Sequence, residues 1–240
     1  MTLPVVVEAG NFRTELVVTN WSSTRKSLQF RYLADAIQAP NQTATFSMDV
    51  QPFSQLIWSD LVQRLRDSGT VGVGAKGANF AGPLFVSAAT GDLTGVAVAA
   101  RTSAPGDIGQ YGLFYPAAPE GSTSTSEAWL YGLQQNAENR TNLALVNTGE
   151  NAATPDTFRI ELFAGNTGQK AATVEGISVE AGHWAQINTI LTQYAPGVSQ
   201  GYARITRISG SNPFIAYAVI NDGAQAGQRS GDGAFLSKAP

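Results

Sequence analysis

The sequence predicts an all-β protein made of two tandem β-sandwich domains, related by internal duplication and each with at most one short helix. Three observations predict it. One motif occurs twice along the chain, short segments alternate between apolar and polar residues, and turn residues recur about every 8–12 positions. A parallel α/β sheet is disfavoured, because no helical segment long enough for a crossover lies between the predicted strands.

The duplication is visible in the motif Arg-Thr-x-Leu-x-x-x-Asn, which begins at Arg13 and again at Arg140, an offset of 127 (140 − 13). Further matches follow in the same order: Leu33-Ala34 with Phe163-Ala164, Ile57 with Ile187 and Leu61 with Leu191 at an offset of 130, Gly91 with Gly210 at 119, and Gly112-x-Phe114 with Gly233-x-Phe235 at 121. The drop from 130 to 119 places an insertion in the first copy. It falls in the Gly-rich residues 67–82, where we expect a flexible loop.

In the first copy, residues 27–33 show the pattern best: Leu28, Phe30 and Tyr32 alternate with polar residues, as in a sheet with one dry face. A turn is expected at residues 39–42, and Ser59 or Asp60 can cap a short helix at 61–66. The predicted strands are Leu3–Glu8, Thr14–Asn20, Ser27–Leu33, Ala44–Val50, Gln55–Trp58, Leu84–Ala89, Gly95–Arg101 and Tyr111–Tyr115.

The second copy repeats this plan, with a short helix around residues 190–194. Its predicted strands are Trp129–Gln134, Thr141–Val146, Phe158–Phe163, Ala172–Val179, Gly201–Ile208, Phe214–Ile220 and the pair Phe235-Leu236. Apart from Pro119, the segment 118–126 has no apolar side chain larger than alanine, and it is the expected linker. We therefore expect domains at residues 3–117 and 127–238.

Composition narrows the classes of function. The charges, fifteen Lys and Arg against eighteen Asp and Glu, form no runs, which argues against nucleic-acid binding. No apolar run is long enough for a membrane-spanning helix. The absence of cysteine removes disulfides and thiolate chemistry. Residues 1–4 are not a signal peptide, so either the protein is made without one or this is a mature or excised chain that begins at an added methionine. We favour the second, because low charge with abundant Thr, Ser, Asn, Gln and Gly is typical of exported proteins.

The order of these features resembles a repeat found in exported or surface proteins of environmental bacteria, and more faintly the small β-sandwich of the sensory rhodopsin transducer family. In that family a strand ending in Asn precedes a turn and a paired strand, and a pair like Arg101-Thr102 follows the hairpin near the end. In the second copy Asn221-Asp222 is expected at the place of that pair. The resemblance implies a β-sandwich that binds a partner and oligomerises, with no catalytic residues to carry over.

Candidate reactive residues are few. His183, the only histidine, falls in a predicted turn beside Trp184, and no Gly-x-Ser-x-Gly elbow accompanies it. Clusters of Asp and Gly at residues 105–107, 221–223 and 230–233 match no calcium loop and are interpreted as turns. We therefore expect no catalytic residue, no metal and no cofactor.

The sequence thus predicts a non-catalytic exported or cell-surface protein that acts in assembly or adhesion, through a protein partner or self-association. Leu3–Glu8 and Trp129–Gln134 are expected edge strands where chains can pair. The alternative is a carbohydrate- or small-ligand-binding module that uses Trp21, Trp184 and His183, because the two tryptophans fall in predicted turns while most other aromatic residues are expected in the core. A hydrolase that uses His183 is the third possibility.

Overall fold

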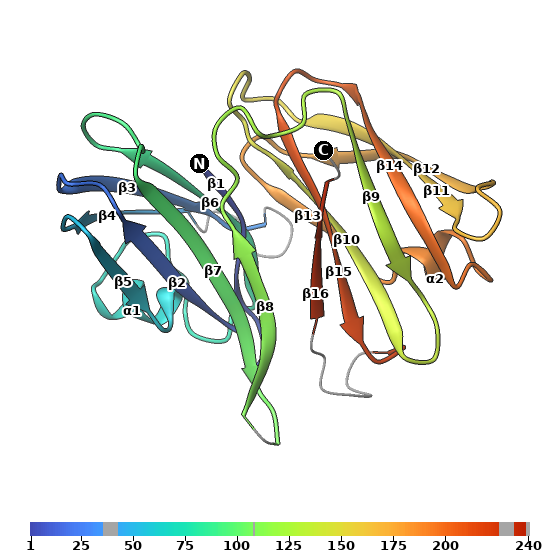
Figure 1. Ribbon diagram of the computed structural model, residues 1–240, viewed down its shortest axis with the longest axis horizontal. Helices are drawn as coiled ribbons and strands as arrows, with labels where there is room; N and C mark the ends of the chain where they lie inside the picture. The colour runs from blue at the N-terminus through green and yellow to red at the C-terminus, as the bar shows by residue number, and fades with distance from the viewer. Residues whose placement is uncertain (36–42, 108, 226–232, 239–240) are drawn as a thin grey trace. The chain divides into compact units, whose positions relative to one another are not determined.

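A computed structural model describes residues 1–35, 43–107, 109–225 and 233–238. The chain divides into two compact units, Met1–Ser122 and Thr123–Pro240 (Figure 1). The turn expected at 39–42 and most of the Asp–Gly cluster at 230–233 lie outside the described residues.

The first unit is a sandwich of two antiparallel sheets, with strand orders β1-β6-β3-β4 and β5-β2-β7-β8. The helix α1, Leu61–Asp67, is capped by Asp60, whose side chain accepts the Gln63 backbone N–H, and it buries Leu61, Val62 and Leu65. The strands are β1 Thr2–Glu8, β2 Arg13–Asn20, β3 Lys26–Leu33, β4 Thr43–Val50, β5 Ser54–Trp58, β6 Phe80–Ala88, β7 Val96–Pro105 and β8 Gln110–Pro116.

The second unit has the same architecture, with sheets β12-β11-β14-β9 and β13-β10-β15-β16 and one short helix, α2, Ile190–Tyr194. Its buried side chains, among them Leu143, Phe158 and Phe214, form one core between the two sheets. The strands are β9 Glu127–Gln134, β10 Asn139–Asn147, β11 Asp156–Ala164, β12 Lys170–Val179, β13 Trp184–Ile187, β14 Gln200–Ser209, β15 Phe214–Asp222 and β16 Gly233–Ser237.

The strand orders confirm the duplication, because replacing each strand of the first unit by its counterpart eight strands later reproduces both sheets of the second. Registers agree as well. Leu16 pairs with Ala100 and Leu143 with Ala218, and Leu143 lies 127 residues after Leu16, as the motif predicts. The two units are therefore copies of one all-β sandwich.

The same registers correct two of the predicted equivalences. Leu16 pairs with Trp58 and Leu143 with Ile187, so Trp58, and not Ile57, corresponds to Ile187. The offset there is 129 (187 − 58), which makes Ile190 the counterpart of Leu61. Likewise Arg101 pairs with Phe114, and Val219 pairs with Phe235, the counterpart of Phe114. Val219-Ile220 therefore correspond to Arg101-Thr102, and the expected match with Asn221-Asp222 is wrong.

The Gly-rich insertion is shorter than expected and makes specific contacts. Strand β6 begins at Phe80, which is 1% exposed, so residues 80–82 belong to the sandwich and not to the loop. Within the loop, the Arg66 Nε donates to the Gly74 carbonyl at 2.9 Å, and the Asn79 Oδ1 accepts the Gly10 N–H at 2.9 Å. The loop is therefore tied to α1 and to the β1–β2 turn.

Candidate functional site

The repeated threonine joins the two sheets of each sandwich. Thr14 on β2 accepts the Val7 N–H at 2.8 Å and donates to the Val7 carbonyl at 3.0 Å, and Val7 lies on β1 in the other sheet. Thr141 makes the same two bonds with Gln134, both at 2.8 Å. The threonine of the motif thus satisfies a backbone donor and acceptor where β1 or β9 passes the opposite sheet.

The repeated asparagine also bonds to backbone groups, at the other end of the strand. The Asn20 Nδ2 donates to the carbonyls of Thr24, Val50 and Gln51 at 2.8, 3.1 and 3.1 Å, and its Oδ1 accepts the Ser22 N–H at 3.0 Å. In the second copy Asn147 donates to the Val179 carbonyl and accepts the Gly149 N–H, both at 3.0 Å. Both asparagines are 0% exposed. Because these polar groups are occupied inside the sandwich, the motif is structural.

Of the three side chains predicted to bind a ligand, Trp21 meets the expectation of exposure, since it follows β2 and is 57% exposed. The turn position expected for Trp184 is wrong. Trp184 is the first residue of β13, is 6% exposed, and its indole Nε1 donates to the Tyr217 hydroxyl at 2.7 Å. His183 is half-buried in the turn before it, and its backbone carbonyl accepts the Asn147 N–H at 3.0 Å.

Replacing Tyr217 by Phe tests this internal role of Trp184. The change removes the acceptor of a buried indole N–H, so we expect the free energy of unfolding to fall by about 1–3 kcal/mol. Denaturant unfolding followed by tryptophan fluorescence measures it. Tyr131→Phe, at an exposed position, is the control and is expected to change stability by less than about 0.5 kcal/mol. Equal stabilities for the two variants would contradict the assignment.

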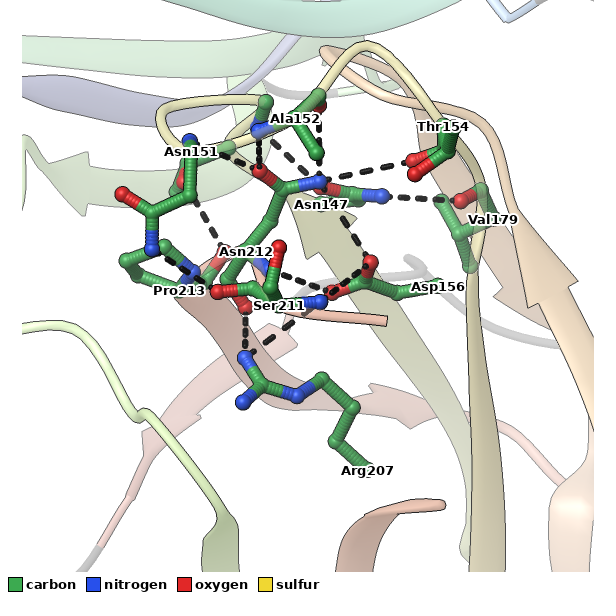
Figure 2. Close-up of polar contacts among 12 residues, drawn as sticks. Asn147, Asn151, Ala152, Thr154, Asp156, Val179, Arg207, Ser211, Asn212 and Pro213 are labelled. Carbon is green, nitrogen blue, oxygen red and sulfur yellow. Dashed lines mark hydrogen bonds and ion pairs between the residues drawn. The ribbon is translucent and has the colours of Figure 1, made fainter. Parts of the chain in front are cut away.

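A buried polar cluster closes one end of the second sandwich (Figure 2). The Asp156 carboxylate, 0% exposed, accepts the backbone N–H groups of Ser211 and Asn212 at 3.2 and 3.0 Å, and Arg207 lies 3.9 Å away. The Asn212 Oδ1 accepts the N–H groups of Asn151 and Ala152, both at 2.8 Å. The Asp156 carboxylate thus attaches the start of β11 to the loop between β14 and β15, and the Asn212 amide attaches that loop to the one before β11.

This cluster differs between the copies. Strand β11 of the second unit corresponds to β3 of the first, with Phe158 at the position of Leu28. Two residues earlier on each strand, Asp156 therefore corresponds to Lys26. Lys26 contacts Asp92 at 3.2 Å in the equivalent loop of the first unit. The charge on the strand is therefore reversed while the loop remains attached, as expected for a structural contact. Among the described residues, no group of three or more His, Asp or Glu side chains is placed to hold a metal ion.

A cluster of aromatic side chains on the outer face of the sheet β12-β11-β14-β9 was missed by the sequence analysis. Phe163, Tyr202 and Tyr131 face one another in register across β11, β14 and β9, and Trp129 lies beside them on β9. Ring centroids are 4.9 Å apart for Phe163 and Tyr202, 5.7 Å for Tyr131 and Tyr202, and 6.2 Å for Trp129 and Tyr131. We call these four residues the aromatic face.

The sequence signal for this face is ambiguous. On β9, Trp129 and Tyr131 alternate with Ala128, Leu130 and, after an irregular step, Leu133. Both faces of the strand are thus apolar, and alternation cannot say which one is dry. In the structure Leu130 is 0% exposed and Tyr131 is 52% exposed, so the aliphatic side is the core and the aromatic side faces outward.

Ion pairs border the aromatic face. Arg204 donates to the Glu127 carboxylate at 2.6 Å, and its guanidinium carbon lies 5.6 Å from the Trp129 ring centroid. The Arg204 hydrogen bond, with a smaller contribution from the Trp129 indole, holds the pKa of the Glu127 carboxyl below its usual range. Lys170 pairs with Glu161 at 3.0 Å. Acids and bases on this face therefore compensate one another.

A hollow of about 330 Å³ lies at the end of the same two strands, where Gln135 follows β9 and Ser199 precedes β14. The Gln135 Oε1 is buried and has no hydrogen-bond partner. The remaining lining residues are Leu191, Thr192, Pro196, Gly197 and Val198. The hollow is thus lined mostly by small side chains, with no charged residue among them.

Fold and contacts together define a protein of two duplicated antiparallel β-sandwiches whose repeated polar residues are structural. No family model matches the chain. No curated protein matches it either. Among solved structures, the major pilin protein T3.2 from Streptococcus pyogenes serotype GAS13637 aligns with this chain at 11% identity over 97% of this chain and 94% of the pilin, with a TM-score of 0.21. A likeness at that TM-score does not establish a common fold. The resemblance to the sensory rhodopsin transducer family gains no support from these comparisons. Within the described residues, no helix combines the length and the apolar character needed to cross a membrane.

Proposed function

We propose that this protein is a non-catalytic adhesion protein of the cell surface or extracellular space that binds its target through the aromatic face. The observation that carries the proposal is the difference between the two copies. Both keep the threonine and asparagine contacts between their sheets, whereas four aromatic side chains occupy the outer face only in the second. Side chains that diverge while the framework is kept are expected to serve a specific contact.

The surroundings of the polar residues support a non-catalytic role. Asp156 is occupied by backbone amides, and the repeated asparagines bind backbone groups inside their own sandwich. A nucleophile, a general base and a residue that orients the base would have to meet in space, and the chain has a single histidine. Low charge and abundant small polar residues favour an extracellular location.

Self-assembly through edge strands is the second candidate. Strand β1 pairs only with β6 among the described strands, and β9 only with β14, so both are edges as predicted. However, β1 contains Pro4, and β9 contains Gly132 at φ +85° beside a register shift. Proline and bulges are the usual means by which an edge strand avoids pairing with another chain. We therefore favour adhesion through the sheet face over assembly through its edge.

The experiment is a sedimentation assay of the full chain with washed bacterial cell envelopes, beside light scattering across a wide concentration range. We expect wild type to bind envelopes as a monomer and the Trp129→Ala/Tyr131→Ala variant to remain in the supernatant. Trp21→Ala is the matched control, because it removes an exposed tryptophan from the first unit. Equal sedimentation of wild type and the double variant, or no sedimentation at all, would refute adhesion through this face.

A further inference from the structure

We propose that the aromatic face is a binding site for an uncharged polysaccharide, with Tyr131 and Trp129 as the side chains that stack on sugar rings. This inference rests on the proposed function, because it names the ligand of the same face. It differs from the alternative predicted by the sequence, in which Trp21, Trp184 and His183 bind the ligand. Trp21 lies in the other unit, and Trp184 is buried in the core.

The geometry shows which rings are open to a ligand. Phe163 and Tyr202 are almost parallel, at 7° with centroids 4.9 Å apart, so each ring covers one face of the other. Tyr131 stands at the end of this row on the edge strand β9, and half of its surface is exposed. Trp129 has a plane parallel to that of Tyr131 within 7°. Tyr131 is therefore the ring most open to solvent, and Trp129 lies half-buried beside it, supported by Phe163 and Tyr202.

The chemistry of these side chains fits a sugar. One face of a pyranose ring carries C–H groups, which are apolar and slightly positive and pack on the negative face of an aromatic ring. The hydroxyl groups around its rim need donors and acceptors nearby. Glu127 and Arg204 supply both beside Trp129, since a carboxylate that accepts from a guanidinium has further lone pairs free to accept from a hydroxyl.

The charge balance selects an uncharged ligand. Glu127, Glu161 and Glu175 on this sheet are each within ion-pair distance of a basic side chain. Arg204, Lys170 and Arg159 are those partners, so three acids face three bases and the face has no net charge. A nucleic acid could also stack on aromatic rings, but its phosphates require a surplus of Lys and Arg. An acidic polysaccharide is disfavoured for the same reason.

The first unit lacks this site, which sets the stoichiometry. By register, Thr2 and Pro4 on β1 take the places of Trp129 and Tyr131, while Pro83 and Leu33 take those of Tyr202 and Phe163. None of these four residues has an aromatic ring. Each chain is therefore expected to bind polysaccharide at one site, in the second unit.

The test is affinity electrophoresis of the full chain through gels that contain one polysaccharide each, followed by calorimetric titration with soluble fragments of any that retard it. The uncharged set is a β-glucan, a xylan, a galactomannan and a starch, and the charged set is alginate, polygalacturonate and DNA. We expect retardation by at least one uncharged polymer, one site per chain, and affinity about tenfold or more weaker in both Tyr131→Ala and Trp129→Ala. Tyr131→Phe should keep the affinity, because the ring is retained.

Several results would overturn the inference. One is retardation by none of the uncharged polymers, or by the charged set alone. Another is loss of binding in Trp21→Ala but not in Tyr131→Ala. A third is a wild-type dimer that dissociates in Tyr131→Ala, which would make the face an interface between copies. Thermal unfolding of each variant shows whether it is folded, and Tyr131→Phe keeps the test valid if an alanine variant is not. Envelope binding through the aromatic face without polysaccharide binding would sink this inference and leave the adhesion role standing. Absence of both envelope binding and polysaccharide binding would refute the adhesion role and this inference together.

Discussion

Gly82→Ala is expected to destabilise the first sandwich by about 4 kcal/mol, a large part of the stability of an ordinary domain. A Cβ at this position would lie 1.8 Å from the Leu33 carbonyl oxygen and 2.8 Å from the Ala34 Cα, so the backbone at the end of β3 would have to move. Gly82 pairs with Val6 at a register shift in the β1–β6 ladder, where the third strand, β3, passes close. Glycine is needed here for lack of space and not for its backbone angles.

The second copy provides an internal comparison. Gly201 is the counterpart of Gly82, pairs with Leu133 beside the equivalent register shift, and would place a Cβ 2.3 Å from the Phe163 carbonyl oxygen. Gly201→Ala should therefore destabilise the second sandwich, by somewhat less. Hydrogen–deuterium exchange of the full chain, read peptide by peptide, would show which unit opens.

Gly165→Ala is the control for both substitutions, because its Cβ would meet its nearest atom, the Gln200 carbonyl oxygen, at 3.2 Å. A small shift can relieve that contact, so a loss below about 1 kcal/mol is expected. Wild-type exchange rates throughout Gly82→Ala would show that the close approach of β3 and β6 is not a feature of the folded protein.

The duplicated fold could be predicted because the residues that hold it are the ones the chain repeats. Thr14 and Asn20 recur as Thr141 and Asn147 for a physical reason: each fills a buried position where only its own donor and acceptor pattern satisfies the backbone. The strand β3 could be predicted from its alternation, and Leu28, Phe30 and Tyr32 are indeed buried. The repeated motif and the alternation of apolar and polar residues are therefore enough to predict the order of the elements.

Errors occurred where the local pattern is short. Strand β13 has four residues, too few for a period of two to be recognised, and Gly182 before it, at φ +78°, does form a turn. Trp184 was consequently placed in the turn, although its side chain points to Tyr217 in the core. The one-residue error in matching Ile57 with Ile187 has the same origin, since β5 also lacks a clear apolar side: Ile57 is exposed and Trp58 is half-buried.

The aromatic face could not be predicted because its residues come from three strands that are distant in sequence. Trp129 and Phe163 have ring centroids 6.0 Å apart but are separated by 34 positions (163 − 129). Only the pairing of β11, β14 and β9 brings them to one surface. Taken singly, each aromatic residue in a strand is more simply explained as part of a core.

Asn20→Ala is expected to reduce the free energy of unfolding by about 3–4 kcal/mol, and Asn147→Ala by about 2–3 kcal/mol, because each buried group left without a partner costs about 1–3 kcal/mol. Asn20 donates to three carbonyls and Asn147 to one among the contacts described above, which sets the order of the two effects. Denaturant unfolding of the full chain measures both. Asn188→Ala, at an exposed position, is the control and should change stability by less than about 0.5 kcal/mol.

Asn147→Asp separates the hydrogen-bond argument from simple loss of packing. The substitution keeps the size and the acceptor for the Gly149 N–H, but it places a carboxylate oxygen against the Val179 carbonyl in a position with no exposed surface. Burial and that contact would raise the folded-state pKa of the new carboxyl above its unfolded value of about 4. The protonated form can donate as the amide does, so the variant should approach wild-type stability below about pH 4 and lose stability as the pH rises through the raised pKa. A stability deficit that is the same at acid and neutral pH would show that the amide donor is not what holds β10 to β12.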